Sequence, residues 1–341
     1  MQSTHRARRC APLAVQATRS GLPAETVARL RKGGAMSSQS VGGFRIANDL
    51  LGSPAQLKAL LADEGYLFFR GTLDLDEVDA TKRDLVHVLA GQGVVKPDRA
   101  EPIWTGAALD QIDDVALYSL SSYQALSEGS AKRLAEEVFG EPVFMFKNPN
   151  IRYSLPDHSQ YVTPAHQDRF FIRGTTAFCT LWIPLMDLDE TMGGLVVAAG
   201  SHRRGLREHA EQPDVYSYVF RGRRQKGVSL ADIAEPQLTA EYHPGDVLLF
   251  HNLTLHWALP NRSDRIRLSI DTRAQPANAP RTFQLERTIL ELRQYRKDVQ
   301  RIAKEAGAGE AVFEAVLIEM MQRGAPAERQ SVEALISELA P

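Results

Sequence analysis

Hydrophobic positions with helical spacing characterise the N-terminal part of the chain. Leu57, Leu60 and Leu61 recur so that they share one face of a helix. A short aromatic run between glycines, residues 65–71, has the composition of a strand. The spacing predicts helices over residues 50–63, 74–89 and 130–139.

The pattern changes from Val143 onward to short runs of β-branched and aromatic residues between turn signals. Runs of this length and spacing are typical of a β-sandwich or barrel. The expected strands cover residues 143–147, 150–154, 161–167, 177–186, 194–198, 239–242, 246–251 and 265–273. We therefore expect a mainly β fold with flanking helices.

Helical spacing returns after Thr282. One expected helix face holds Leu285, Ile289, Leu292 and Tyr295, and the next holds Val312, Phe313, Val316, Leu317 and Met320. Gly307 and Gly309 separate these two helices, and Pro326 precedes a last one at 329–339. We expect residues 281–341 to form a C-terminal α-helical extension, which packs on the β domain or joins two copies in a homodimer.

Residues 1–40 differ in composition from the rest of the chain. Seven basic side chains there face the single acid Glu25, and a second methionine, Met36, opens a polar stretch. An arginine-rich, acid-poor start is a feature of transit peptides. A disordered leader or a mis-called start codon is the interpretation that we favour, with the ordered domain over residues 41–280.

The overall composition is that of a globular protein. Hydrophobic residues make up 43% of the 341 positions, and the formal net charge is −2. A charge so close to zero gives no general attraction to nucleic acid or to an anionic membrane, and no apolar run is long enough to span a bilayer. The two cysteines, Cys10 and Cys179, form no metal-spaced cluster, which favours a reducing cytoplasm.

His166 and Asp168 give the clearest chemical signal. Residues two apart in a strand share one face, so both side chains can reach a single metal ion. His256 would complete the facial triad of two histidines and one carboxylate found in non-haem iron sites, which leaves three iron positions open. Arg267, eleven residues beyond His256, has the planar guanidinium that binds a carboxylate through two hydrogen bonds.

These residues belong to an ordered set of motifs. The set comprises Thr163-Pro164-Ala165-His166-Gln167-Asp168, Gly193-Gly194-Leu195, Gly200-Ser201-His202 and Pro244-Gly245-Asp246-Val247-Leu248-Leu249-Phe250-His251. In this order, within residues 44–275, they resemble the phytanoyl-CoA dioxygenase family of Fe(II)/2-oxoglutarate oxygenases. Ala199 stands where the family usually has proline, and the region after residue 280 exceeds the family core.

The resemblance implies a double-stranded β-helix, or jelly roll, for residues 41–280. It implies that Fe(II) is held by His166, Asp168 and His256, with 2-oxoglutarate and O2 as cosubstrates and Arg267 paired with the 2-oxoglutarate C5 carboxylate. The implied reaction is oxidation, most simply hydroxylation, of a small-molecule substrate of specialised metabolism, with release of succinate and CO2. The presence of a carboxylate at position 168 disfavours halogenation.

Neighbouring residues are alternative candidates for two of these roles, the second histidine ligand and the arginine anchor. His251 and His256 are expected in one strand, where a separation of five residues places them on opposite faces. The step to Arg267 favours His256 as the ligand. Arg262 and Arg265 are alternatives to Arg267 as the anchor.

Several other residues have both a functional and a structural interpretation. Trp182 either lines the cosubstrate pocket or packs in the core, and the insertion 203–236 is either a lid or a solvated loop. His202 and Gln167 are expected to have structural roles. The side chains that either contact the substrate or serve as rim charges and core filling are Lys147, Arg152, Arg169, Arg173, Phe170 and Phe171.

Two other classes of function remain as alternatives. One is a cupin-like metalloenzyme that does not use 2-oxoglutarate, against which Arg267 argues. The other is a non-catalytic jelly-roll binding protein, against which the intact set of His166, Asp168 and His256 argues.

Overall fold

The computed structural model describes most of the chain from residue 41 onward. The described residues are 41–97, 99–107, 116–117, 119–148, 150–157, 162–172, 175–211, 219–220, 223–224, 226–281, 287 and 289–339. The predictions for residues 1–40 and for Arg173 and Leu285 lie outside them.

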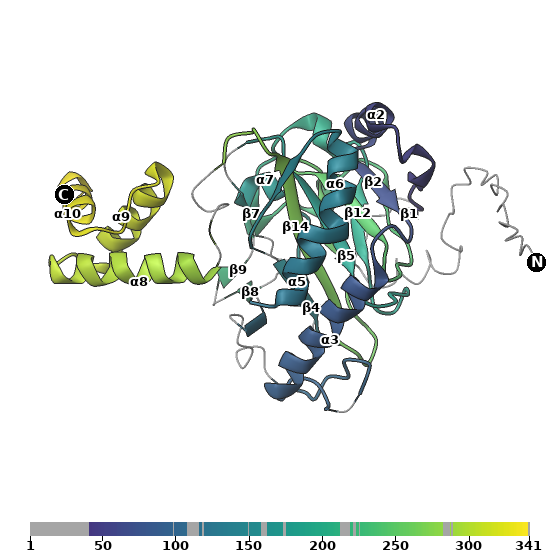
Figure 1. The fold of residues 1–341 in the computed structure, drawn as a ribbon, viewed down its shortest axis with the longest axis horizontal. Coiled ribbons are helices and arrows are strands. Elements are labelled where there is room, and N and C mark those ends of the chain that lie inside the picture. Colours follow the sequence, from purple (N-terminus) through teal and green to yellow (C-terminus); the bar gives the residue numbers. More distant parts are fainter. Residues whose placement is uncertain are drawn as a thin grey trace, which may run out of the picture.

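Two β-sheets form the centre of the molecule (Figure 1). The larger sheet has the order β2-β12-β5-β14-β3, with β4 also paired to β14, and the smaller has the order β1-β11-β6-β13. All pairs are antiparallel except β1 with β11. The strands are β1 Val41–Gly42, β2 Tyr66–Phe69, β3 Val143–Met145, β4 Asn150–Ser154, β5 Cys179–Pro184, β6 Leu195–Ala198, β11 Gln237–Leu238, β12 Val247–His251, β13 His256–Ala258 and β14 Arg267–Pro276. The predicted mainly β, jelly-roll fold is confirmed.

Helices cover the outer face of the larger sheet (Figure 1). Tyr123 on α5 donates a hydrogen bond to Thr272 of β14 at 3.1 Å, which ties this layer to the sheet. The helices of the domain are α2 Pro54–Glu64, α3 Leu75–Gly91, α5 Ser121–Leu126, α6 Lys132–Phe139 and the short α7 Asp168–Phe171. The turn Ser127–Ala131 joins α5 to α6, so the helical region predicted at 130–139 starts earlier than its spacing indicated.

The insertion 203–236 packs on the outside of the smaller sheet where it is described. Val228 and Ile233 join a buried apolar cluster with Val196 of β6 and Trp257 of β13. Two short ribbons lie in the same insertion, β7 Ala210–Glu211 with β10 Lys226–Gly227 and β8 Val219–Phe220 with β9 Arg223–Arg224. Its described C-terminal part therefore covers a sheet face, as a packed segment does.

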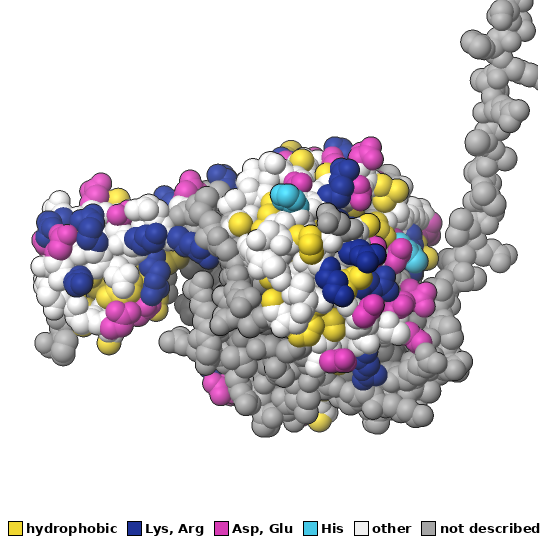
Figure 2. Space-filling model, turned by 90° about the horizontal axis from the view of Figure 1, so that it is seen from below, with side chains coloured by type: hydrophobic (Ala, Val, Ile, Leu, Met, Phe, Trp, Pro, Cys, Tyr) yellow, Lys and Arg dark blue, Asp and Glu magenta, His cyan; other side chains and the backbone are white. Residues whose placement is uncertain are grey.

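Three helices follow the β domain and have a core of their own. They are α8 Ile289–Glu305, α9 Glu310–Arg323 and α10 Arg329–Leu339, and they lie beside the jelly roll (Figure 1). Their buried apolar side chains, from Tyr295 to Leu335, form one cluster. Acidic and basic side chains alternate over this helical unit (Figure 2), and many of them pair, as Arg296 does with Glu314. The predicted helical extension is confirmed.

Three local predictions are wrong. In the described part of the expected strand 161–167, only His166 pairs, in an isolated bridge with His256. Asp168 instead opens α7, since the Ile172 amide donates to its carbonyl. At the expected strand 239–242, β11 has already ended at Leu238.

His251 and His256 lie in different strands, contrary to the sequence prediction. His251 ends β12 in the larger sheet, and His256 opens β13 in the smaller one. The turn between them is fixed by side chains: Asn252 donates to the carbonyls of Thr176 and Phe178, and Thr254 donates to that of Gly65. These bonds take the backbone out of the ladder and into the facing sheet.

Candidate metal centre

Three buried side chains meet between the two sheets. His166, Asp168 and His256 each offer one ligand atom, and these atoms lie within 4.8 Å of one another. Asp168 Oδ1 is 3.6 Å from His166 Nε2 and 3.8 Å from His256 Nε2. The two histidine backbones exchange both amide hydrogen bonds at 3.0 Å, which fixes their separation.

The orientation of both imidazole rings is set by backbone carbonyls. His166 Nδ1 lies 2.8 Å from the Pro164 oxygen, and His256 Nδ1 lies 3.0 Å from the Thr254 oxygen. Because a carbonyl only accepts, each Nδ1 carries a proton, and each Nε2 is the atom directed at the centre; in a neutral ring that atom has a free lone pair. This is the tautomer that a metal-binding histidine needs.

The charge states also suit a cation. Burial, and to a smaller extent the neighbouring His166, lower the pKa of His256 to about 3, so the ring is neutral near pH 7. Burial on its own would raise the pKa of Asp168, but Arg273 and the two histidines hold it well below its usual range. The centre therefore offers an ionised carboxylate and, on His256, a neutral imidazole nitrogen.

The second oxygen of Asp168 has two donors of its own. Thr180 Oγ1 donates to Asp168 Oδ2 at 2.5 Å, and Arg273 Nε donates to the same atom at 3.0 Å. Thr180 and Arg273 are paired across β5 and β14, so their side chains leave the larger sheet on the same face. The sequence analysis missed both; the signal was that Arg273 has the same strand parity as Arg267.

Alternate residues of β14 project from this inner face. Asp271 is the next of these residues from Arg273 toward Arg267, and its Oδ2 lies 4.0 Å from Arg273 Nη2. Arg152 of β4 donates through Nε to the same aspartate oxygen at 2.9 Å. A row of alternating charges thus leads from Asp168 toward the position of Arg267.

Arg267 lies buried at the end of this row. Its Nη1 donates to the Gly193 carbonyl, whereas its Nε has no hydrogen-bond partner among the described residues, and neither does the buried Ser269 hydroxyl. Burial, and to a smaller extent the neighbouring Arg152, lower the pKa of Arg267 to about 10, which still leaves a cation near pH 7. A small cavity opens beside it, lined by Ile151, Arg152, Tyr153, Ser154, Val162, Thr163, Ala258 and Arg267.

Comparison with known proteins shows the family of this chain. The family model for phytanoyl-CoA dioxygenase (PhyH) matches residues 61–269, more than half of the chain. The chain belongs to the phytanoyl-CoA dioxygenase family. As the resemblance implied, it is an oxidoreductase of the Fe(II)/2-oxoglutarate-dependent oxygenase class, with O2 as the second cosubstrate.

Named relatives cover most of the same length. A 1-deoxypentalenic acid 11-beta-hydroxylase of Streptomyces arenae is 37% identical over 246 residues, or 69% of this chain and 85% of the relative. The enzyme of the same name from Streptomyces exfoliatus is 34% identical with the same coverage. A solved structure of the non-haem alpha-ketoglutarate-dependent carbocyclase SnoK from nogalamycin biosynthesis aligns over 66% of this chain and 85% of its own, with 22% identity and a TM-score of 0.48.

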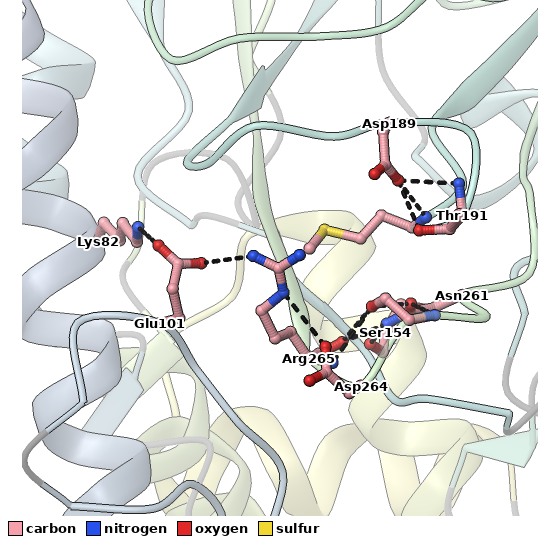
Figure 3. Close-up of polar contacts among 10 residues, drawn as sticks. Lys82, Glu101, Ser154, Asp189, Thr191, Asn261, Asp264 and Arg265 are labelled. Carbon is pink, nitrogen blue, oxygen red and sulfur yellow. Dashed lines mark hydrogen bonds and ion pairs between the residues drawn. The ribbon is translucent and has the colours of Figure 1, made fainter.

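Arg262 and Arg265, the two alternatives to Arg267 for binding 2-oxoglutarate in this phytanoyl-CoA dioxygenase, lie away from the buried cavity. Arg265 pairs with Glu101 and with Asp264, both at 3.4 Å, and Glu101 also pairs with Lys82 (Figure 3). Arg262 lines an open surface groove and not the buried cavity. Only Arg267 of these three arginines lines the cavity beside β13.

The other residues that the sequence offered as site candidates make packing contacts or hydrogen bonds within the protein. Trp182 is buried in the core against Tyr242, with ring centroids 4.7 Å apart, and is not among the residues that line the cavity at Arg267. His251 packs near His202, with ring centroids 5.5 Å apart. Gln167 is fully buried, and its amide donates to the carbonyls of Gly205 and Leu253. These contacts support the packing alternatives.

Of the residues that were candidates for substrate contact, some lie at the cavity or the candidate metal centre and others do not. Arg152 lines the cavity. Arg169 instead donates to the Ile172 carbonyl, and Lys147 is exposed. Phe171 lies beside the metal centre, its ring 5.6 Å from that of His166.

Proposed function

We propose that His166, Asp168 and His256 bind the Fe(II) of this oxygenase and that Arg267 binds the C5 carboxylate of 2-oxoglutarate. The observation that supports this most directly is the convergence of two histidine Nε2 atoms and one carboxylate oxygen within 4.8 Å, in a buried centre. Three donors of these types suit iron and leave coordination positions for small molecules.

The surroundings of Arg267 fit a carboxylate. Two buried donors there, Arg267 Nε and the Ser269 hydroxyl, lack protein partners among the described residues. A buried donor without a partner costs about 1–3 kcal/mol, so a bound carboxylate would relieve both. Arg152 adds positive charge at the same cavity.

The protein's part in the reaction is to hold and to orient. Bound Fe(II), 2-oxoglutarate and O2 supply the oxidising chemistry, which yields succinate, CO2 and an oxidised product. The carbonyls of Pro164 and Thr254 hold the two imidazoles in the ligand tautomer. The ring of Phe250, 4.3 Å from the ring of His256, covers one side of the centre with apolar surface and limits the access of water.

We propose that the reaction is hydroxylation of a small molecule with an apolar skeleton. Phe171 stands beside His166 and is 44% exposed, so its ring offers apolar surface next to the buried centre. Phe170 and His209 support it, with their rings stacked 4.2 Å apart at an angle of 10°. The name of the Streptomyces arenae relative, a hydroxylase acting on 1-deoxypentalenic acid, agrees with a role in specialised metabolism.

The two rival functions are less well supported. A cupin-like enzyme without 2-oxoglutarate would leave the buried Arg267 without a ligand to bind, and family membership argues against it. A non-catalytic binding protein has no need of two histidines held in the same tautomer around one carboxylate.

The cellular location and the assembly of the protein are two further proposals. Among the described residues no helix is long and apolar enough to cross a membrane. We propose a cytoplasmic enzyme from its cysteine usage. We also propose a homodimer through the C-terminal helices, because Ile318 and Leu339 on these helices are 54% and 38% exposed.

Succinate release tests the proposed activity. Purified protein with Fe(II), 2-oxoglutarate and O2 is expected to form succinate, faster when 1-deoxypentalenic acid or a similar apolar substrate is added. Succinate formation that does not depend on added Fe(II) would contradict the proposal. The variant Asp168→Ala is expected to form none above background.

A further inference from the structure

One oxygen of Asp168 is committed to protein donors. Thr180 and Arg273 both donate to Oδ2, whereas Oδ1 faces the two histidine Nε2 atoms. Thr180 is 0% exposed and Arg273 is 5% exposed, so water does not compete for these bonds. The carboxylate therefore has one face that is already bonded and one that is directed at the centre.

Arg273 is itself fixed on its other side. The Asn150 amide oxygen accepts from both Nη atoms at 3.0 and 3.1 Å, in the orientation that satisfies both groups. Asp271 Oδ2 lies 4.0 Å from Nη2. The guanidinium is thus held between β4, β14 and Asp168, and its Nε cannot follow the carboxylate if that group rotates.

We propose that Arg273 and Thr180 are positioning residues that restrict Asp168 to a single metal-binding oxygen. A carboxylate can otherwise bind a metal through both oxygens, which would occupy a fourth coordination position. With Oδ2 retained by two donors, three positions stay open, enough for a chelating 2-oxoglutarate and one further small molecule. This inference rests on the proposed role of Asp168 as an iron ligand.

An anaerobic titration of the Fe(II)-loaded protein with 2-oxoglutarate tests the inference. The readouts are the dissociation constant of 2-oxoglutarate from its charge-transfer absorption and, separately, the affinity for Co(II) in competition with a chelator. In Thr180→Val and Arg273→Met we expect 2-oxoglutarate to bind about 10- to 100-fold more weakly while the metal remains bound. Thr180→Ser keeps the hydroxyl and is expected to restore binding close to that of the unaltered protein.

The control separates positioning from folding. Arg265→Met removes a cation from the same strand region but not from Asp168, and it is expected to bind 2-oxoglutarate normally. If Arg273→Met fails to fold, the comparison of Thr180→Val with Thr180→Ser decides. Unchanged 2-oxoglutarate affinity in Thr180→Val would overturn the inference. Absence of the absorption in the unaltered protein would instead contradict the proposed function.

Discussion

At the scale of the residue, single hydrogen bonds determine which atoms of the candidate site can bind a metal. The carbonyls of Pro164 and Thr254 fix which nitrogen of each histidine is free, and burial keeps His256 neutral. The sequence order identified His166, Asp168 and His256 as a candidate set, because ligand type and order are visible in it. Thr180 and Arg273 were missed: strand parity places Arg273 on the same face of β14 as Arg267, but the contact of both residues with Asp168 depends on how β5 pairs with β14.

Arg267 gives the first prediction at this scale. We expect Arg267→Ala to weaken 2-oxoglutarate binding by about 10- to 100-fold, since hydrogen bonds to a charged group contribute about 1.5–3 kcal/mol. Fe(II) affinity is expected to stay the same, because Arg267 is not among the three converging residues. Isothermal titration of each ligand measures both values, and equal 2-oxoglutarate affinity in the two proteins would refute the anchor assignment.

His251 gives a pH-dependent prediction. Burial lowers its pKa to about 4 from an ordinary 6.5, so between these values the unfolded chain binds a proton that the folded protein does not. The free energy of unfolding therefore falls as the pH drops from 6.5 to 4. In His251→Asn, which keeps an acceptor for the Leu253 amide, we expect a smaller fall. Urea denaturation of metal-free protein across this range measures it, and identical slopes would contradict the assignment.

At the scale of the element, turns position Arg267, the proposed anchor. Gly193 has a φ of 68°, and an added Cβ would lie 2.4 Å from the Pro260 oxygen and 2.8 Å from the Leu259 oxygen. The same glycine provides the carbonyl that accepts from Arg267. The turn between β5 and β6 therefore requires glycine for both backbone conformation and close approach.

Gly193→Ala is expected to lower stability and 2-oxoglutarate affinity together. Backbone strain of this kind costs about 1–3 kcal/mol, and the contact with the Pro260 carbonyl adds to it. Gly52→Ala is the matched control, because Gly52 has a φ of 85° but open space around its Cβ. It is expected to lose stability without any change in 2-oxoglutarate binding. Equal effects of the two substitutions on binding would show that the turn does not support the anchor.

Strand prediction succeeded where apolar alternation was regular and failed around the site. The expected strand 150–154 and helix 329–339 match β4 and α10. The segment around His166 has no such regularity, because its backbone leaves the ladder to begin α7. Ala199, where the family usually has proline, uses its amide to donate to the Pro236 carbonyl at 2.8 Å, a bond that proline cannot form.

The whole molecule combines a jelly roll with a helical unit that has a separate core. The buried residues of that core all come from α8 to α10, whereas the proposed metal centre lies between the sheets. Helical periodicity predicted these helices, but the sequence does not determine what they contact, since that depends on surfaces brought together by folding.

A protein that ends after Arg287 tests the separation of the two parts. We expect it to bind Fe(II) and 2-oxoglutarate like the full chain, and to retain the Asn148 contact with the Arg287 carbonyl. If the helices join two copies, the full chain is expected to sediment as a dimer and the shortened one as a monomer. Loss of 2-oxoglutarate binding on shortening would contradict the separation, and a dimer that persists would contradict the proposed interface.

Anaerobic visible absorption of the purified protein is the most direct test of the central claim that iron and 2-oxoglutarate meet at one site. A weak charge-transfer band that requires both Fe(II) and 2-oxoglutarate is the expected result. Asp168→Ala is expected to lack it. Iron bound without any band after 2-oxoglutarate is added would contradict the account.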